Sequence, residues 1–423
     1  MSPAVKCLIL VAVVAILFIT ELIPLAVTAT AGSIACGVLG LLPNKQVFSG
    51  LSNSTVVLFA GMFVVGAAMF YTGLAQNIGE TVVRLCGRGE NSLMFGLMLV
   101  GTVLSAFLSN TGTAACLLPV ALGICSVAKL PASRELMPLA FACGWGGIIT
   151  MVGTPPNIIA TGALSAAGLE TYTFFEWAWI GIPISVAGML YMMFVGKYLL
   201  PKRELSADVE VEQEIEATSH SKSKQIIAGV IFVIVVLVMA SGTKILSLEM
   251  AAVAGALVCV LTGCLTEKQA YGSIDWVTIF LFAGMMPVSS AMDKTGAGKL
   301  IAEWTVSLMG GDPSPYVVTG VLFMLSCFLT QFMSNTASAA LLCPIGIAIA
   351  KQLNADPKAV VGAIAVAASC AFATPVGTPP NTLVLTPGGY AFMDYVKAGC
   401  GLVVVSFIVC IILLPIIWPF FPA

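Results

Sequence analysis

The feature that most constrains this chain is an internal duplication. Three blocks recur in the same order at an offset of 223 to 225 residues. They are LFAGM at 58 and 281, SNT at 109 and 334, and GTPPN at 153 and 377. Matched blocks in one register indicate two copies of one structural unit. The chain is therefore expected to fold as two related halves.

The solvent for most of the chain is expected to be lipid. Of its 423 residues, 59% are hydrophobic and 9% are charged, which is more apolar than a soluble domain of this length tolerates. The runs 7–20, 227–240 and 399–421 are free of charge, and a helical span needs roughly 20 such residues. The first run continues into Glu21, Pro24 and more apolar sequence without an evident cleavage site, so we expect a permanent span rather than a signal peptide.

Hydropathy predicts five spans and one hairpin in each half. The expected spans lie at 5–20, 23–42, 54–74, 136–165 and 172–200, and then at 224–241, 247–265, 276–294, 359–388 and 395–420. Before the fourth span of each half, two shorter apolar segments meet at an SNT triplet. These pairs predict re-entrant helical hairpins at about 92–128 and about 316–350. Each GTPPN is expected to break the fourth span, because consecutive prolines remove N–H donors and begin a new helix.

Five spans is an odd number, so the second half is expected to be inverted relative to the first. The first repeat then covers 1–200, a charged linker covers 201–224, and the second repeat covers 225–423. Lysines and arginines of the linker place it in the cytoplasm, with both termini outside. The predicted fold class is an all-α polytopic membrane protein of two inverted repeats of five transmembrane helices, each with a re-entrant helical hairpin and a broken helix. The inner membrane of a cell is its expected location.

The SNT triplets predict an anion-binding site. Hydroxyl and amide groups at a helix N-terminus lie beside free backbone N–H donors and the positive end of the helix dipole. Two such ends that face each other would bind a small anion. Carbonyl groups freed where GTPPN breaks a helix are suitable ligands for sodium, so a cation and an anion can bind side by side.

The residue types that are absent exclude other functions. No Asp, Glu, Lys or Arg occurs at 93–128, 137–169, 316–350 or 359–392, which disfavours a proton relay. A net charge of -2 without a basic patch disfavours a nucleic-acid partner. The single histidine and the scattered cysteines disfavour a metal centre or a disulfide framework. A membrane-embedded enzyme would lack a nucleophile paired with a base, so we expect no enzyme and no cofactor other than coupling ions.

The second GTPPN lies within a longer motif that resembles a family signature. Residues 369–384, SCAFATPVGTPPNTLV, fit the pattern S-x-x-F-x-x-P-hydrophobic-G-x-x-x-N-x-hydrophobic-V of the divalent anion/sodium symporters, the di- and tricarboxylate transporters. The resemblance covers nearly the whole chain and implies a homodimer with elevator-type alternating access. Two departures are visible: Ile148 and Met151 replace the Phe and Pro upstream of the first GTPPN, and an additional N-terminal helix common in the family is not evident.

The resemblance also implies specific ligands. The first sodium site would comprise Ser105, Ser109, Asn110 and Gly153, and the second Thr330, Met333 through its carbonyl, Asn335 and Gly377. The substrate-binding residues would be Ser109, Asn110, Thr111, Thr154, Ser334, Asn335, Thr336, Thr378 and Pro379.

The implied function is sodium-coupled secondary active transport of a divalent anion across the bilayer, with a C4-dicarboxylate favoured. A dicarboxylate exchanger and a sulfate or tartrate transporter on the same site are alternatives, as is a sodium-independent efflux permease.

Overall fold

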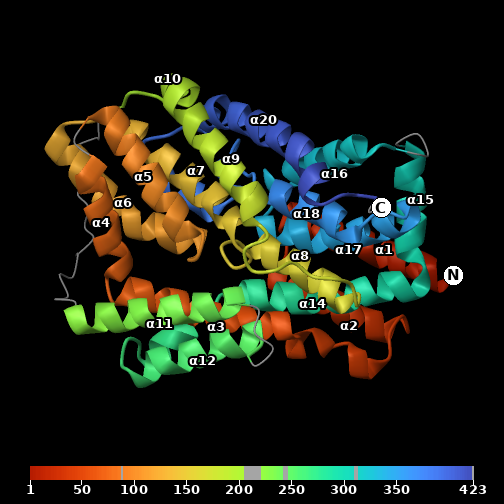
Figure 1. The fold of residues 1–423 in the computed structure, drawn as a ribbon. Helices are drawn as coiled ribbons and strands as arrows, with labels where there is room; N and C mark the ends of the chain where they lie inside the picture. The colour runs from red at the N-terminus through yellow and green to blue at the C-terminus, as the bar shows by residue number, and fades with distance from the viewer. Residues whose placement is uncertain (87–88, 204–220, 242–245, 309–312, 422–423) are drawn as a thin grey trace.

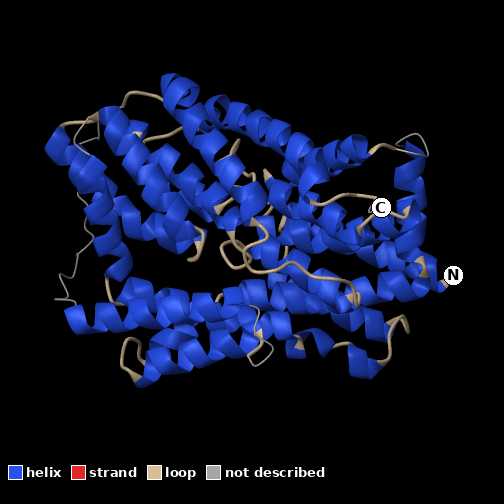
Figure 2. Cartoon of the chain, in the orientation of Figure 1, coloured by secondary structure: helices blue, strands red, loops and turns tan. Residues whose placement is uncertain are grey.

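The computed structural model describes residues 1–86, 89–203, 221–241, 246–308 and 313–421, and within these ranges it contains helices and no strands (Figure 2). The first half contains α1 (Pro3–Thr20), α2 (Leu25–Val38), α3 (Ser54–Tyr71), α4 (Leu74–Cys86), α5 (Glu90–Ser105), α6 (Asn110–Ala128), α7 (Leu136–Gly146), α8 (Pro155–Ala166), α9 (Ala178–Tyr191) and α10 (Lys197–Leu199). The second half contains α11 (Lys222–Ser241), α12 (Leu248–Leu261), α13 (Glu267–Gly272), α14 (Trp276–Thr295), α15 (Ala297–Leu308), α16 (Pro315–Thr330), α17 (Asn335–Leu353), α18 (Pro357–Ala368), α19 (Pro379–Leu385) and α20 (Phe392–Ile417). A π-helical turn at Met192–Gly196 joins α9 to α10, and short 3-10 turns lie at Asn44–Gln46, Ser49–Ser52, Ala132–Arg134 and Gly147–Ile149.

The order of the elements repeats, as the duplicated blocks predict. The predicted hairpins are α5 with α6 and α16 with α17, and the predicted broken spans are α7 with α8 and α18 with α19. The all-helical polytopic fold is therefore confirmed. The inversion of the two halves across a membrane stays a prediction. Most of the predicted 201–224 linker, residues 204–220, lies outside the described residues.

Apart from the six-residue α13, two helices were not predicted. Residues 74–86 and 297–308 form α4 and α15, each placed between the third predicted span of its half and the hairpin. Hydropathy misses them because both are amphipathic, so charged residues such as Glu80 and Glu303 interrupt the apolar run along the sequence. Each packs against the hairpin of its own half, α4 on α5 and α6, and α15 on α17. Each repeat therefore contains an amphipathic helix that was not predicted from the sequence, α4 in the first and α15 in the second.

The long helices and their outer faces fit a membrane. Eight segments of the described chain are long and apolar enough to cross a bilayer, namely α1, α3, α6, α9 with α10, α11, α14, α17 and α20. Two of these, α6 and α17, are arms of the predicted hairpins. Ile16, Ile234 and Ile412 are each more than half exposed on α1, α11 and α20. Such exposure of large apolar side chains is suited to lipid rather than to water.

The helices form two layers (Figure 1). One layer contains α2, α3, α11, α12 and α14, and the other contains the hairpins and the broken helices. Packing crosses the two halves: α2 lies on α14, and its counterpart α12 lies on α3. Likewise α8 packs on α17, and its counterpart α19 packs on α6. Each half is therefore completed by elements of the other.

Two equivalent glycines permit the cross-packing of the first layer. A Cβ at Gly61 in α3 would lie 2.7 Å from the carbonyl carbon of Ala252 in α12. A Cβ at Gly284 in α14 would lie 2.6 Å from the carbonyl carbon of Ala29 in α2. Small residues of this kind let helix backbones approach closely inside a membrane.

We expect Gly61→Ala and Gly284→Ala each to destabilise the protein by about 1–3 kcal/mol, because the added methyl group must displace a neighbouring backbone. Gly272→Ala is the matched control, since a Cβ at this position meets no atom within 4 Å. The measurement is the thermal denaturation midpoint in detergent. Equal midpoints for all three variants would contradict the close approach of the helices.

Candidate substrate and sodium sites

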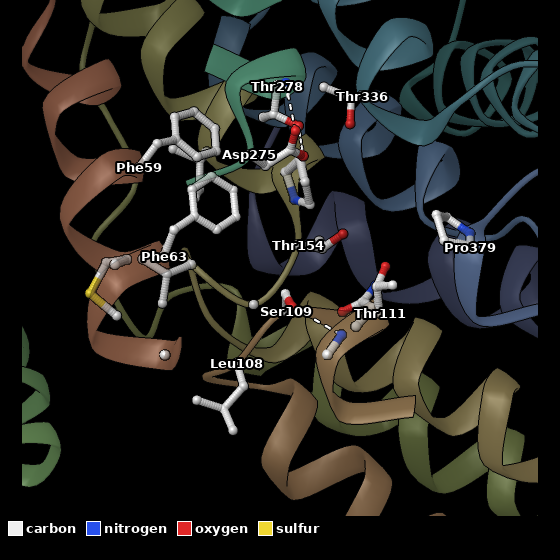
Figure 3. Close-up of a pocket in the computed structure, with 18 of the residues that line it drawn as sticks. Phe59, Phe63, Leu108, Ser109, Thr111, Thr154, Asp275, Thr278, Thr336 and Pro379 are labelled. Atoms are coloured by element: carbon white, nitrogen blue, oxygen red, sulfur yellow. Dashed lines mark hydrogen bonds between the residues drawn. The ribbon is translucent and has the colours of Figure 1, made fainter. Parts of the chain in front are cut away.

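A cavity of about 450 Å³ lies between the two layers, and both copies of both motifs line it. The hairpins contribute Ser109–Thr111 and Ser334–Thr336, and the broken helices contribute Thr154 and Thr378 with the prolines that follow them. Figure 3 shows Ser109, Thr111 and Thr154 on one side of this space, with Thr336 and Pro379 across from them. The structure therefore brings together the substrate-binding residues that the sequence predicts, from segments far apart in the chain.

Four helices begin at this cavity. Asn110 and Asn335 are the first residues of α6 and α17, while α8 and α19 begin at Pro155 and Pro379. Each N-terminus presents partial positive charge. The first N–H groups of α6 and α17 also have no intrahelical partner and can act as donors, whereas the prolines at the first two positions of α8 and α19 have no N–H. The sequence predicted two facing helix ends, and the broken helices contribute two more. Four convergent N-termini make this cavity suitable for an anion.

The capping residues leave polar groups available. Ser109 Oγ accepts a hydrogen bond from Gly112 N at 3.1 Å, and Ser334 Oγ accepts one from Ala337 N at 3.1 Å. These two hydroxyls therefore act first as caps that order the tips of the hairpins. Thr154 and Thr378 make no such cap, and the Oγ1 atom of Thr154 is buried without a partner. An unpartnered hydroxyl beside the cavity needs a ligand or water to satisfy it.

Oxygen atoms surround one end of the Asn110 amide. When Nδ2 faces them, its two N–H groups lie within hydrogen-bonding distance of three acceptors, Gly153 O at 3.0 Å, Cys143 O at 3.1 Å and Ser105 Oγ at 2.7 Å. When Oδ1 faces them instead, Ser105 Oγ lies 2.7 Å from both Oδ1 and Cys143 O. One hydroxyl proton cannot serve two acceptors. The second orientation therefore leaves an excess of oxygen that suits a hard cation such as sodium.

The second half contains the same arrangement. When Nδ2 of Asn335 faces inward, its two N–H groups lie within hydrogen-bonding distance of Gly377 O at 3.1 Å, Ala368 O at 3.1 Å and Thr330 Oγ1 at 2.7 Å. In the opposite orientation Thr330 Oγ1 lies 2.7 Å from Oδ1 and from Ala368 O. Of the predicted sodium ligands, Ser105, Asn110 and Gly153 thus meet in one cluster, and Thr330, Asn335 and Gly377 meet in the other. The carbonyl groups of Cys143 and Ala368 were not predicted.

Two of the predicted sodium ligands, Ser109 and Met333, are not among the atoms of these clusters, whereas Gly153 belongs to the first cluster. Ser109 has its hydroxyl engaged as a cap, as described above. Met333 is buried at the second tip, where its N–H donates to Leu329 O at 3.1 Å. Gly153 is tightly enclosed, since a Cβ there would lie 2.5 Å from Gly147 O and 2.8 Å from Ala106 O. Glycine at this position therefore permits several carbonyl groups to approach one point.

The last residue of each GTPPN motif fixes the break in the helix. Asn157 Nδ2 donates to Ile148 O at 3.1 Å and to Thr150 O at 2.9 Å. Asn381 Nδ2 donates to Ala371 O and to Thr374 O, both at 2.9 Å. Both asparagines are fully buried. They satisfy carbonyl groups that the broken helices leave free, so their role in the structure is to hold the breaks rather than to line the cavity.

The residues that form the walls of the cavity were not predicted from the sequence. Phe59, Phe63 and Phe70 of α3 line one side, and the ring of Phe70 packs where a side chain at Gly112 would lie. Asp275 lies on the α14 side, where its carboxylate caps the helix through Thr278 N at 3.2 Å and Thr278 Oγ1 at 2.6 Å (Figure 3). Among the described residues that line the cavity, Asp275 alone carries a charged side chain.

A family model described as "Citrate transporter" matches residues 15–342 and 286–422, which is nearly the whole chain. The chain belongs to the citrate transporter family. This membership supports the predicted resemblance to the divalent anion/sodium symporters, and the protein is an integral, multi-pass membrane transporter rather than an enzyme.

Named relatives agree with this assignment. The chain is 31% identical over 418 residues to a protein of Haemophilus influenzae named "Uncharacterized transporter", with 92% of this chain and 87% of that protein covered. It is 27% identical over 442 residues to the "Sodium-dependent dicarboxylate transporter SdcS" of Staphylococcus aureus, with 95% and 84% covered. The crystal structure of the YdaH transporter of Alcanivorax borkumensis has a similar fold, with a TM-score of 0.68, 16% identity and 98% of both chains covered.

In this citrate transporter family member, polar contacts hold together the helices that carry the first oxygen cluster. The two helices are α5, which ends at Ser105, and α7, which contains Cys143. At their far ends Arg134 forms an ion pair with Glu90 at 2.8 Å, and nearer the cavity Trp145 Nε1 donates to Thr102 Oγ1 at 2.8 Å.

Glu135, which immediately precedes α7, is fully buried, and neither of its carboxylate oxygens has a hydrogen-bond partner. Burial, reinforced by the charge of Glu90 and opposed by Arg134, raises the pKa of Glu135 from 4.5 to about 8. The neutral acid is therefore the stable form in this conformation at pH 7.

We expect the stability of this conformation to fall as the pH rises from about 4.5 to about 8. The exposed carboxyl of the unfolded chain loses its proton near pH 4.5, whereas folded Glu135 keeps its proton until about pH 8. Glu135→Gln should raise the thermal denaturation midpoint at pH 8 and flatten its pH dependence, while Glu267→Gln, at an exposed site, should change neither. An unchanged pH dependence in Glu135→Gln would show that Glu135 does not carry the effect.

Proposed function

We propose that this citrate transporter family member is a sodium-coupled symporter of a divalent anion, with a C4-dicarboxylate as the favoured substrate. The observation that carries the proposal is the pairing of two features in one cavity. Four helix N-termini converge on it, and no Lys or Arg occurs among its described lining residues. An anion there must be balanced by helix ends and by bound cations.

The charges agree with a dianion. A helix N-terminus with free N–H groups is equivalent to roughly half a positive charge, so α6 and α17 together supply about one, and the dipoles of α8 and α19 add to it. Two sodium ions at the oxygen clusters would add positive charge beside the anion. Because Asn110 and Asn335 belong both to the clusters and to the cavity lining, each residue can contact sodium and substrate at once. Sodium is in this proposal a co-substrate that crosses the membrane with the anion.

The presence of two separate hairpin tips in one cavity favours a substrate with two separated carboxylates. Each tip offers its own set of donors, from Asn110 and Thr111 on one side and from Asn335 and Thr336 on the other. A C4-dicarboxylate can place one carboxylate at each tip, whereas sulfate concentrates its charge at one point. The name of the Staphylococcus aureus relative, a sodium-dependent dicarboxylate transporter, supports the same choice.

Alternating access completes the proposal. The cavity extends toward Tyr71 at the end of α3 and Asp275 at the start of α14. Both positions lie on the cytoplasmic side in the predicted topology, so this conformation would be inward-facing. The layer of hairpins and broken helices would then move as an elevator against the layer of α2, α3, α11, α12 and α14. The homodimer implied by the resemblance is part of the same proposal.

Uptake of radiolabelled succinate into proteoliposomes tests this function. We expect an inward sodium gradient to drive uptake by the wild type. Asn110→Ala and Asn335→Ala should each reduce uptake roughly ten- to a hundredfold, because each loses a charge-assisted hydrogen bond together with a sodium ligand. Asn44→Ala, at an exposed site away from the cavity, is the matched control and should transport normally.

Other outcomes identify the alternatives. Uptake that ignores sodium but requires internal dicarboxylate would indicate an exchanger. Sodium-driven uptake of citrate, sulfate or tartrate in place of succinate would keep the mechanism and change the substrate. Transport that neither sodium nor either asparagine affects would contradict the proposal.

A further inference from the structure

We propose that the side-chain amides of Asn110 and Asn335 reverse when sodium binds, and that this reversal makes binding of the anion depend on sodium. The inference rests on the proposed function, because it assigns sodium to the two oxygen clusters. It adds a coupling device within the site that neither the motifs nor the comparisons supply.

Without sodium, each amide is stable in one orientation. With Nδ2 of Asn110 facing inward, its two N–H groups donate to Gly153 O and Ser105 Oγ, and the Ser105 hydroxyl donates to Cys143 O. Every polar atom in the cluster then has a partner. Reversal in the empty site would place Oδ1 among these oxygens with a single hydroxyl proton to share. A buried set of unpaired acceptors is strongly disfavoured.

With sodium in the cluster, the opposite orientation of the amide becomes the more stable one. The cation needs oxygen ligands and repels the positive end of an amide N–H. Oδ1 then becomes the inward atom, and the carbonyl groups of Gly153 and Cys143 bind the cation instead of the amide. Asn335 is expected to reverse in the same way at Gly377 O, Ala368 O and Thr330 Oγ1.

Reversal of each amide also changes the atom that faces the cavity, which both residues line. In the empty site Oδ1 is the outward atom, and an acceptor oxygen repels a carboxylate. In the sodium-bound site Nδ2 is the outward atom and donates to the carboxylate. Each reversal should change succinate affinity roughly ten- to a hundredfold, the usual effect of a charge-assisted hydrogen bond.

The chain provides matched controls for this movement. Asn157 and Asn381 are the nearby asparagines of the two GTPPN motifs, and each donates through Nδ2 to two carbonyl oxygens. Their carbonyl partners belong to the helix breaks and do not enter the oxygen clusters. Sodium should therefore leave these two amides in place.

Solid-state NMR of the full chain in liposomes tests the reversal directly. The protein carries ¹⁵N at the side-chain amide of asparagine and ¹³C at the glycine carbonyl, so dipolar coupling reports the contacts of Asn110 with Gly153 and of Asn335 with Gly377. We expect both couplings in choline chloride and their loss in sodium chloride. Asn110→Ala and Asn335→Ala assign the two signals. With ¹³C at the threonine carbonyl, the couplings of Asn157 to Thr150 and of Asn381 to Thr374 should persist in both salts.

A pair of neutral ligands separates amide reversal from simple charge attraction. Hexane-2,5-dione and succinamide have similar shapes, but the diketone only accepts hydrogen bonds, whereas the diamide both accepts and donates. We expect sodium to strengthen the saturation-transfer NMR signal of the diketone at least tenfold and that of the diamide less than twofold. Attraction between sodium and the carbonyl dipoles that both ligands share would strengthen the two signals alike, as would a general ordering of the site.

The outcomes distinguish this inference from the proposed function. Sodium that raises the thermal denaturation midpoint relative to choline, while both Asn–Gly couplings persist, would overturn the reversal and leave the symporter intact. Sodium that neither stabilises the protein nor alters succinate binding would overturn both. Loss of the couplings at Asn157 and Asn381 as well would indicate rearrangement of the whole site and would also overturn the reversal.

Discussion

The structure depends on the convergence of four helix N-termini on one cavity inside a membrane protein. Free N–H groups at a helix end are costly in an apolar medium unless a partner satisfies them. The N-termini of α6 and α17, whose first N–H groups are free, share one polar space with the N-termini of α8 and α19, so groups that would be costly in lipid form a site for an anion. The two layers, the re-entrant hairpins and the breaks in α7–α8 and α18–α19 all serve this arrangement.

Duplication explains how one chain forms a cavity at which four helix N-termini converge. A single repeat supplies one hairpin tip and one break, which is half of a site. The exchange of partners between halves, with α8 on α17 and α19 on α6, holds the tip of one half beside the break of the other. Gly61 and Gly284 permit the same exchange in the opposite layer by letting backbones touch. The binding site and the packing of the two layers therefore follow from one symmetry.

The sequence predicted these parts unevenly, for physical reasons. Repeated SNT and GTPPN blocks located both tips and both breaks because capping serines and paired prolines determine local structure. Helices α4 and α15 escaped notice because an amphipathic helix is not an apolar run. Residues such as Phe70, Cys143, Asp275 and Glu135 could not be predicted from local pattern, since cavity walls, carbonyl ligands and a buried carboxyl are products of tertiary packing. The orientation of the Asn110 and Asn335 amides is likewise visible only once the surrounding oxygens are in place.

The neutral side chains of Asn110 and Asn335 at the hairpin tips affect how strongly anion binding is coupled to sodium binding. An arginine in place of Asn110 or Asn335 would bind a carboxylate firmly whether or not sodium was present, and transport of the anion would then be independent of the ion gradient. An amide carries no net charge and has a donor at one end and an acceptor at the other. Its interaction with the substrate is therefore set by what occupies the oxygen cluster behind it. A weak, reversible group placed between two binding sites gives stronger coupling between them than a strong, permanent one.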